Sequence, residues 1–377
     1  MKAKLTDLCS IQYGYAFDSD SFTEDSSYPP LVRIRDVKRG YSETFYSGDY
    51  PYQYIIHTGD LLIGMDGEFN IARWKSRDAL LNQRVCKVSA KAGTDEEYLR
   101  FALIGALKEI EDRTAFVTVK HLSAKELNKL VLDVPTYSEQ KRIAVILCKI
   151  EKMLTQRGTE ISALDDLIKA RFVEMFGTYP SNEKGWPTGT IRDLVTEVKY
   201  GSSRKAAEGD SGKYPYLRMN NITYSGELDL SDTKTIDIPD EELDKCTVRR
   251  GDLLFNRTNS KELVGKTCVY NRDELMVLAG FVVRVRLNKK ALPEFVSAFM
   301  NTSFSKQMLL GMCKAAIGQA NINAQELQNI GIYIPPIELQ REFVSFKEQV
   351  DKSKSAIQKS IAETQTLFDN LMQQYFG

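Results

Sequence analysis

The sequence predicts an α+β protein built from two copies of one unit, each a globule of mixed strands and helices followed by a long α-helix. Three observations lead to this prediction. Short segments recur in the same order in both halves of the 377 residues, each half closes with an amphipathic stretch, and short β-rich runs around glycine precede that stretch. We expect the two long helices to pair as an antiparallel coiled coil.

Matched short segments carry the repeat. Tyr13-Gly14 recurs as Tyr200-Gly201, and the GDLL segment at 59–62 recurs at 251–254. The offset between matched positions grows along the globule, and from Ala124 and its counterpart Ala324 it stays constant to the end of the chain. The globule therefore varies in length between the copies, as a loop-bearing part can, whereas a helix packed in register cannot.

In each globule, β-branched and aromatic residues around glycine-rich turns predict three strands, and helical spacing predicts one helix after them. Short helices should begin at Ser123 and Asn323, because a glutamate follows three residues after each and forms a capping box. We expect strands over 31–37, 54–65 and 81–90 in the first copy and over 216–222, 247–255 and 276–287 in the second, with helices over 96–113 and 294–310.

The last part of each copy predicts a long helix. Apolar residues recur at steps of three and four from Ser138 to Phe176, a proline precedes each run, and Gly177 and Gly377 follow it. A plain coiled-coil spacer and a spacer that also docks partner subunits fit this pattern equally well. The residues expected to pair the helices or dock subunits are Ile143, Ile146, Ile150, Leu164, Phe172, Phe343, Phe346, Val350, Ile361 and Phe368.

These elements divide the chain into five segments. We expect a first globule over 1–136, a first long helix over 137–177, a linker over 178–188, a second globule over 189–336 and a second long helix over 337–377. The linker is expected because its residues are rich in turn formers.

Composition excludes several classes of protein. No run of eighteen apolar residues occurs, and the N-terminus lacks the apolar core of a secretory signal, so we expect no membrane partner. Six dispersed cysteines form no CxxC pair and only two histidines occur, so we expect no metal site and a reducing, cytoplasmic location. The 51 basic residues balance the 51 acidic ones.

Enzyme motifs are incomplete. Gly265-Lys266-Thr267 resembles the end of a phosphate-binding loop, but Ser260 occupies the position that needs glycine. Pro335-Pro336 lacks the flanking residues of an amino-methyltransferase motif, and no nuclease pattern follows Pro239-Asp240. We therefore expect no catalytic residues and no cofactor on this chain.

Polar, donor-rich loops follow the matched strands and are typical of nucleic-acid contacts. Arginine can bond guanine bidentately, asparagine and glutamine can bond adenine, and lysine, serine and threonine anchor phosphates. Each loop taken alone is also compatible with an ordinary solvated turn. The candidate DNA-binding residues are Tyr13, Tyr15, Arg33, Arg35, Asn70, Arg73, Gln83, Arg84, Lys120, His121, Lys199, Tyr200, Ser202, Ser203, Arg204, Arg218, Asn220, Asn256, Arg257, Asn259, Lys266, Gln319 and Asn321.

The order of these features, twice over, resembles the specificity subunit of type I restriction–modification systems across essentially the whole chain. The segments that carry the resemblance are the two GDLL segments, LNQRV at 81–85, GQANI at 318–322 and the VPxxxEQKRI segment at 134–143. In the second copy, Leu339 replaces the Glu139 of the first copy.

The resemblance implies a non-catalytic reader of double-stranded DNA. Its two target-recognition domains would each read one half of an asymmetric bipartite site, and its paired helices would set the spacing and dock two modification subunits. Those subunits would bind S-adenosylmethionine and methylate adenine. A motor–nuclease (restriction) subunit that uses ATP and Mg can join them.

A protein–protein adaptor with two binding heads and a coiled-coil spacer is the alternative hypothesis. The charge bears on both hypotheses, because it is balanced locally as well as globally, with a net of −2 over 1–136 and +2 over 178–336. A DNA binder driven by charge alone would need excess lysine and arginine. Neutral globules favour a reader that binds DNA as part of an assembly.

Overall fold

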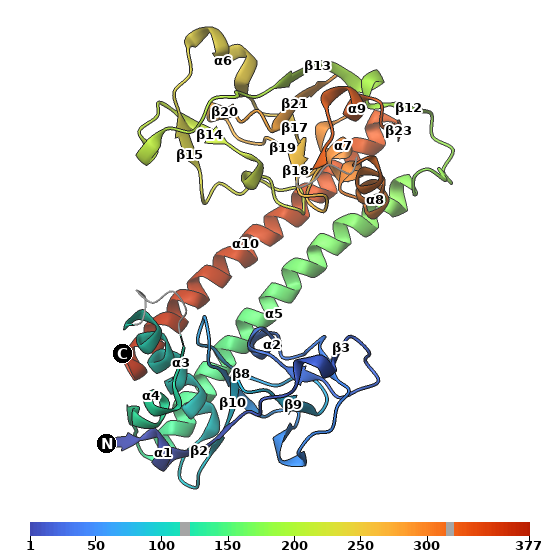
Figure 1. Cartoon of the computed structure of the whole chain (residues 1–377). Coiled ribbons are helices and arrows are strands. Elements are labelled where there is room, and N and C mark those ends of the chain that lie inside the picture. The colour runs from blue at the N-terminus through green and yellow to red at the C-terminus, as the bar shows by residue number, and fades with distance from the viewer. Residues whose placement is uncertain (114–120, 314–319) are drawn as a thin grey trace. The chain divides into compact units, whose positions relative to one another are not determined.

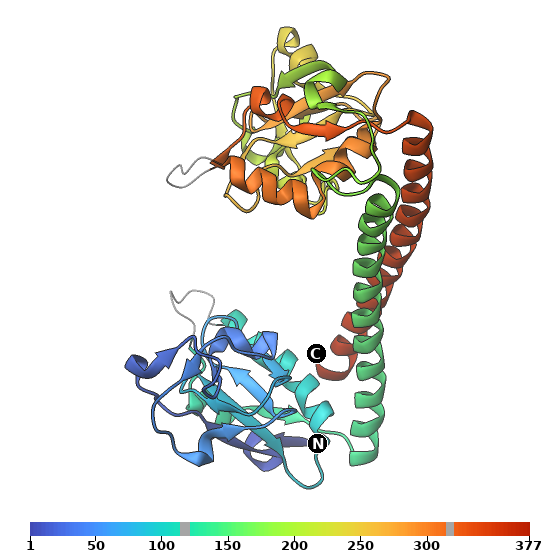
Figure 2. The ribbon, with the colours of Figure 1, turned by 90° about the vertical axis from the view of Figure 1, so that its right-hand side faces the viewer.

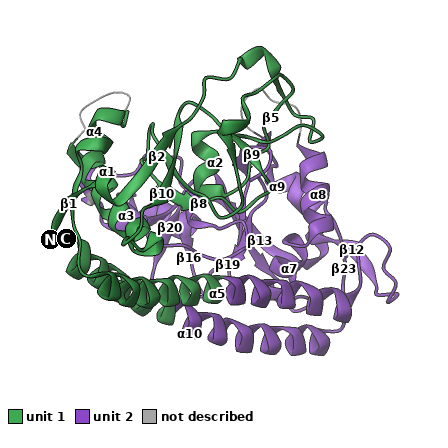
Figure 3. Cartoon of the chain, turned by 90° about the horizontal axis from the view of Figure 1, so that it is seen from below, with its two compact units in different colours: residues 1–158, 359–377 green, residues 159–358 purple. Residues whose placement is uncertain are grey.

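The computed structural model describes residues 1–113, 121–313 and 320–377 (Figure 1). The chain forms two compact units, 1–158 with 359–377 as unit 1 and 159–358 as unit 2 (Figure 3). Each globule therefore takes part of both long helices into its own unit, whereas the sequence suggested separate helical segments.

Unit 1 is built on a four-stranded antiparallel sheet in the order β2-β10-β7-β8. A second sheet, β4-β9-β6, contains one parallel pair, and β1 pairs with β11. The strands are β1 Lys2–Lys4, β2 Cys9–Tyr13, β3 Phe22–Thr23, β4 Leu31–Val32, β5 Phe45–Tyr46, β6 Ile55–Ile56, β7 Leu61–Gly64, β8 Ile71–Arg73, β9 Ala79–Leu81, β10 Val85–Ala90 and β11 Val131–Asp133. The helices are α1 Leu5–Leu8, α2 Ile34–Arg39, α3 Glu96–Arg113 and α4 Ala124–Lys129, with the start of α5 and the end of α10.

Unit 2 repeats this plan with the order β13-β21-β17-β19 in its main sheet and β15-β14-β20-β16 in the second. Its strands are β12 Thr188–Thr190, β13 Val195–Tyr200, β14 Tyr214–Leu217, β15 Lys234–Ile236, β16 Thr247–Val248, β17 Leu253–Asn256, β18 Thr258–Asn259, β19 Thr267–Val269, β20 Met276–Leu278, β21 Val282–Leu287, β22 Ala320–Asn321 and β23 Gly331–Tyr333. Its helices are α6 Asp240–Cys246, α7 Pro293–Met300, α8 Ser303–Met312 and α9 Ala324–Gln328.

The two long helices are α5, Tyr137–Phe176, and α10, Ile337–Phe376. In unit 2, the Phe172 ring lies 5.3 Å from that of Phe343, and Asp165 bonds Lys354, so residues later in α10 meet residues earlier in α5. The pairing is therefore antiparallel, and Figure 2 shows the end of α5 beside the start of α10. Among the residues expected to pair the helices, Ile143, Ile150, Phe172, Phe343 and Val350 are buried, and Ile146, Leu164, Phe346, Ile361 and Phe368 are half-buried.

A buried glutamine ties the start of each long helix to its globule. The side chain of Gln140 accepts the N–H of Asp95 (2.9 Å), and the side chain of Gln340 accepts the N–H of Leu292 (2.9 Å). Each glutamine also donates to the carbonyl of the proline five residues before it. The recurrence of glutamine at the same place in both copies therefore has a structural cause.

Four of the expected strands are each two strands of different sheets. The 54–65 stretch turns at Gly59 (φ 95) between β6 and β7, and 247–255 turns at Gly251 (φ 88) between β16 and β17. A positive φ of this kind favours glycine and ends a strand. The 81–90 and 276–287 stretches likewise break between β9 and β10 and between β20 and β21.

The other corrections come from local capping. The expected strand 31–37 stops at Val32, because the N–H of Arg33 donates to Asp36 (2.9 Å) and the chain turns into α2. The N–H of Arg218 makes the same bond to Asn221 (2.8 Å) and ends the expected strand 216–222 at Leu217. The expected helix 294–310 is two helices, because the Thr302 side chain caps α8 by accepting from Ser305.

Candidate nucleic-acid interface

The same backbone hydrogen bonds frame one loop cluster in each unit. After β7, the N–H of Met65 donates to Arg84 (3.0 Å), and after β17 the N–H of Arg257 donates to Phe281 (3.0 Å). The next matched bonds run from Leu122 to Met65 and from Ile322 to Arg257. These bonds align the two clusters residue by residue where the strands end.

Different side chains occupy the aligned positions. Unit 1 places Tyr15, Met65, Asp66, Arg84 and His121 there, and unit 2 places, in the same order, Ser202, Arg257, Thr258, Phe281 and Asn321. The loop clusters of the two units therefore share the same backbone arrangement but carry different side chains.

In unit 1, a carboxylate organises the cluster. Asp66, whose side chain is 12% exposed, accepts hydrogen bonds from Arg84 and from His121, whose side chains are each 53% exposed. Tyr15 is also exposed and packs on Tyr54 with ring centroids 5.1 Å apart. Gln83 is exposed beside Arg84. An arginine, an imidazole and an amide therefore face solvent together.

In unit 2, an amide oxygen takes the role of the carboxylate. The side-chain oxygen of Asn321 accepts from Thr258 (2.8 Å) and from Arg257 Nε (3.2 Å). The Arg257 guanidinium also lies over the Tyr200 ring, 5.0 Å from its centroid. Phe281 stands beside them with half of its surface exposed. The arginine is thus held in place through Nε, and among the described residues its other guanidinium donors have no hydrogen-bond partner.

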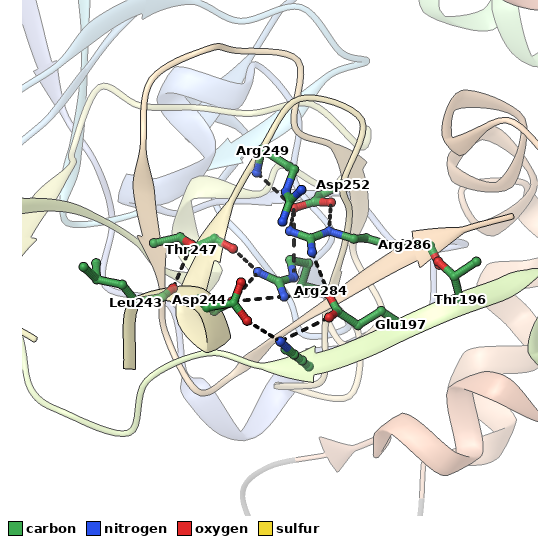
Figure 4. Close-up of polar contacts among 10 residues, drawn as sticks. Thr196, Glu197, Leu243, Asp244, Thr247, Arg249, Asp252, Arg284 and Arg286 are labelled. Atoms are coloured by element: carbon green, nitrogen blue, oxygen red, sulfur yellow. Dashed lines mark hydrogen bonds and ion pairs between the residues drawn. The ribbon is translucent and has the colours of Figure 1, made fainter. Parts of the chain in front are cut away.

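Tyr200, which supports Arg257, ends a strand that is fixed by ion pairs around the buried Arg284. Arg284 of β21, 1% exposed, bonds Glu197 of β13 (2.7 Å) and the backbone of Asp244 (Figure 4). Lys199 donates to Asp244 (2.8 Å) and to Glu197 (3.1 Å), and these bonds raise its pKa. Burial raises the pKa of Glu197, but the bonds from Lys199 and Arg284 outweigh burial and lower it. Lys199 therefore stabilises the strand and has no free charge to offer DNA.

Several other candidates are buried. Asn256 is fully buried, Ser202 is 3% exposed and Lys266 is 7% exposed. Lys266 donates to the carbonyl of Met219 (2.9 Å), and burial lowers its pKa. A direct contact with a base or a phosphate is not open to these three side chains as they are placed, so their part is to shape the loops.

Three further candidates form ion pairs with carboxylates of their own unit. Arg73 bonds Glu96 (2.9 Å) and Glu97 (2.5 Å). Arg204 bonds Glu242 (2.7 Å), and Arg218 bonds Asp232 (2.8 Å). Arg73 lies beside α3, away from the loop cluster, whereas Arg204 and Arg218 belong to surface ion pairs that cost little to open.

The remaining candidates are spread over loops and strand ends. Arg33, Arg35, Ser203 and Asn220 are exposed, whereas Tyr13, Asn70 and Asn259 are half-buried. Arg35 donates to Thr44 (3.3 Å), and the Tyr13 hydroxyl donates to Asn128 (3.2 Å). Lys120 and Gln319 lie outside the described residues.

Sequence reasoning missed Asp66 and Phe281. Asp66 lies in one of the polar loops but is an acid, which is not expected to face phosphates. Phe281 follows the second-copy strand at the position that Arg84 holds in the first. Aligning LNQR with LAGF at 81–84 and 278–281 would have found it.

The described part of the chain contains neither a candidate metal-binding cluster nor a candidate membrane-spanning helix. None of the described residues forms a cluster of three or more histidine, cysteine, aspartate or glutamate side chains that could hold a metal ion. Among the described helices, none is long and apolar enough to cross a membrane.

Comparison with known proteins identifies the family. The model of the type I restriction modification DNA specificity domain matches residues 1–163 and again residues 183–366. The chain belongs to this family. It is a type I specificity subunit with two DNA specificity domains, and its role is the recognition of DNA sequence.

Relatives with known roles agree. The chain is 27% identical to the type I restriction enzyme EcoBI specificity subunit of Escherichia coli, over 99% of this chain and 84% of that one. It is 23% identical to the EcoKI specificity subunit of E. coli K12, over 70% of this chain and 60% of that one. Because these relatives are named specificity subunits, this specificity subunit is the non-catalytic component, which replaces the adaptor hypothesis.

Solved structures share the fold of this specificity subunit. The crystal structure of the S subunit from M. genitalium superposes with a TM-score of 0.57 at 14% identity, covering 100% of this chain and 96% of that one. A chain from a structure on complex assembly and conformational transition of the type I R-M system gives 0.56 at 15% identity, covering 100% and 97%. Both similarities confirm the α+β architecture with its paired long helices.

Proposed function

We propose that this specificity subunit reads an asymmetric, two-part sequence in double-stranded DNA, with unit 1 reading one half and unit 2 the other. The observation that carries the proposal is the pair of aligned loop clusters. One backbone frame presents arginine, histidine and aspartate in unit 1 and arginine, asparagine, threonine and phenylalanine in unit 2. Different side chains at equal positions favour different bases at equal places in each half.

The chemistry of the two clusters suits reading from the major groove. Among the described residues, Arg84 and Arg257 each donate to one side-chain acceptor, which leaves other guanidinium donors to bond O6 and N7 of guanine. Phe281 offers an apolar contact to a thymine methyl group. Gln83 in unit 1 offers a bidentate partner for adenine.

Neutral charge supports a division of labour between this chain and its partners. Much of the basic charge near the clusters is neutralised within the protein, as in Arg204–Glu242 and Arg218–Asp232. Phosphate contacts dominate the affinity of most DNA complexes. We infer that partner subunits supply part of that affinity, while this chain supplies the base contacts.

We propose two modification subunits as those partners, docked on the solvent-facing sides of α5 and α10. They would bind S-adenosylmethionine and methylate adenine, and a motor–nuclease subunit would add ATP and Mg. This chain would hold none of these cofactors. Val145, Met153, Leu167 and Leu367 are exposed apolar residues of the long helices that such subunits could contact.

A binding-site selection experiment tests the proposal. The purified complex of this chain with its partner subunits is incubated with random duplexes, and the bound fraction is sequenced. We expect enrichment of two short conserved blocks separated by a spacer of fixed length. Equal binding of all duplexes, or one continuous block, would contradict the reading of two halves.

A further inference from the structure

A cavity of about 480 Å³ lies in unit 2, and its lining residues are not those of the loop cluster of that unit. Its walls come from α5, from α7 and α8, and from the loop 224–227. Ile168, Phe172 and Ala298 form apolar wall, and Lys306 and Asn301 also line it. This volume is in the range of small-molecule sites.

The repeat explains why the space is open. Asp95 and Leu292 both donate to the glutamine at the start of a long helix, which aligns α3 with α7 residue by residue. Arg100 therefore corresponds to Ser297, and Phe101 corresponds to Ala298. A guanidinium and a phenyl ring of unit 1 are thus replaced by a hydroxymethyl and a methyl group.

On the opposite wall of the cavity, a smaller side chain likewise replaces an aromatic ring of unit 1. In unit 1, the Phe101 ring packs on Phe368, with centroids 6.1 Å apart. The residue of α5 that corresponds to Phe368, by the constant offset of the repeat, is Ile168. Unit 1 therefore fills with two packed aromatic rings a space that Ala298 and Ile168 leave open in unit 2. The open space has the size and lining that suit an aromatic ring.

Two polar atoms at this cavity are buried without a hydrogen-bond partner in the described part of the chain. They are Lys306 Nζ, a donor, and the side-chain oxygen of Asn301, an acceptor. The ammonium group lies 4.9 Å from the centroid of the Tyr224 ring. A buried polar group without a partner costs free energy, and a ligand that supplies the missing bond recovers it.

Lys306 is the lining cation that lacks an acidic partner among the described residues. Lys169 bonds Asp166 (2.9 Å) and Lys347 bonds Asp351 (2.5 Å). The lining carboxylates Asp165 and Glu227 do not serve Lys306, because both are bonded by Lys354. Burial, and then repulsion by Lys266, lowers the pKa of Lys306 to about 8, as expected of an ammonium without an anion.

We propose that this cavity binds a small aromatic carboxylic acid. The ring would lie between Ile168, Phe172 and Ala298, where unit 1 places its own rings, and the carboxylate would accept from Lys306. A donor group on the ligand would satisfy Asn301. This site is separate from the reading of DNA and does not depend on it.

Fluorine NMR of the full chain with 4-fluorophenylacetate tests the proposal. We expect broadening of the probe signal that saturates with a Kd of about 1 mM or tighter, as befits a small fragment. Ala298→Phe restores the ring of unit 1, fills the cavity and should abolish binding. Lys306→Met should weaken binding of the acid about tenfold, the expected loss of one charged hydrogen bond. It should weaken binding of neutral 4-fluorophenylacetamide less, because an amide oxygen accepts a weaker hydrogen bond from the ammonium than a carboxylate does.

Lys289→Met is the matched control, because Lys289 is an exposed lysine of unit 2 that does not line this cavity. It should bind the acid as the unaltered chain does. The proposal is overturned by the failure of 4-fluorophenylacetate to bind at about 10 mM, or by equal binding to a folded Ala298→Phe chain. If that variant does not fold, equal binding of the acid to Lys306→Met overturns it.

Discussion

At the scale of single residues, one acceptor side chain in each unit fixes the side chains that would read bases. Asp66 holds Arg84 and His121, and Asn321 holds Arg257 and Thr258. A held side chain loses less rotamer entropy on binding than a free one. The residue that orients an arginine should therefore contribute to the affinity of that arginine for a base.

Arg257→Ala should weaken DNA binding by about 1–3 kcal/mol and relax sequence preference in one half of the site only. The reason is the loss of the guanidinium that Tyr200 and Asn321 hold in place. Competition binding with duplexes altered in either half measures both effects. Arg250→Ala is the control, because Arg250 pairs with Asp273 instead. Relaxation of the other half would refute the assignment.

Asp66→Asn should relax the other half of the site. An amide accepts more weakly than a carboxylate, so Arg84 and His121 lose their common charged partner. We expect a loss of affinity of about tenfold with little change in folding, because the side chains of Arg84 and His121 are half-exposed. Binding to duplexes altered in each half, with thermal unfolding as the folding check, measures it. Unchanged preference in both halves would rule out this role for Asp66.

At the scale of elements, ion pairs attach a long helix to the globule in each unit, but the cation is an arginine in unit 1 and a lysine in unit 2. In unit 1, Arg100 of α3 bonds Glu151 of α5 through both terminal guanidinium nitrogens (2.9 and 2.7 Å). In unit 2, Lys354 of α10, 3% exposed, bonds Asp165 of α5 and Glu227 of the 224–227 loop. A buried lysine at a seam position also fixes the register of a helix pair.

Lys354→Met should destabilise unit 2 by about 1–2 kcal/mol, because two carboxylates lose their cation while staying partly exposed. Chemical denaturation measures the change. Lys352→Met, two residues earlier on the exposed side of α10, should leave stability unchanged. Equal effects of the two substitutions would show that the buried position does not matter.

Glu97 predicts an acid-dependent stability of unit 1. Burial raises its pKa, but the bonds from Arg100 and then Arg73 outweigh burial and lower it below the ordinary value. A lowered folded-state pKa contributes stability above the unfolded pKa, about 4.3, that is lost as pH falls through the folded value. Glu97→Gln should therefore lower the melting temperature at neutral pH. The difference from the unaltered chain should shrink below about pH 4. A difference independent of pH would contradict this account.

A charge introduced by substitution on a long helix tests the pairing of the two long helices. Ile146→Asp and Phe346→Asp each place a carboxylate on a half-buried position of α5 or α10. We expect loss of assembly with partner subunits while both globules stay folded, because the cost of burying an unpaired charge falls on the helix contact. Size-exclusion chromatography with the partners and hydrogen exchange of the globules measure this. Retained assembly would contradict the docking role.

At the scale of the whole chain, the repeat is what made the fold predictable from sequence. The constant offset over the last part of each copy located both long helices, and Gln140 and Gln340 show why the helix starts do not drift. Strand limits were harder to predict, because Gly59 and Gly251 divide apolar runs between two sheets. Periodicity alone cannot show that division, which depends on the partner of each strand.

The site was less predictable than the fold. Polar residues in matched loops look alike in sequence, yet in the folded chain Asn256 and Lys266 are buried whereas Arg84 is exposed. Burial of this kind depends on segments distant along the chain, such as the Met219 carbonyl that Lys266 reaches. Comparison of the two copies by their backbone hydrogen bonds brings Phe281 and Asp66 into the cluster.

The division of reading between the two units is tested most directly by mapping modified adenines. Genomic DNA is sequenced from cells that produce the partner subunits with the unaltered chain, with Arg84→Ala or with Arg257→Ala. We expect one two-part methylated sequence for the unaltered chain, relaxation of one half with Arg84→Ala and relaxation of the other half with Arg257→Ala. Relaxation of the same half by both substitutions, or no change with either, would contradict it.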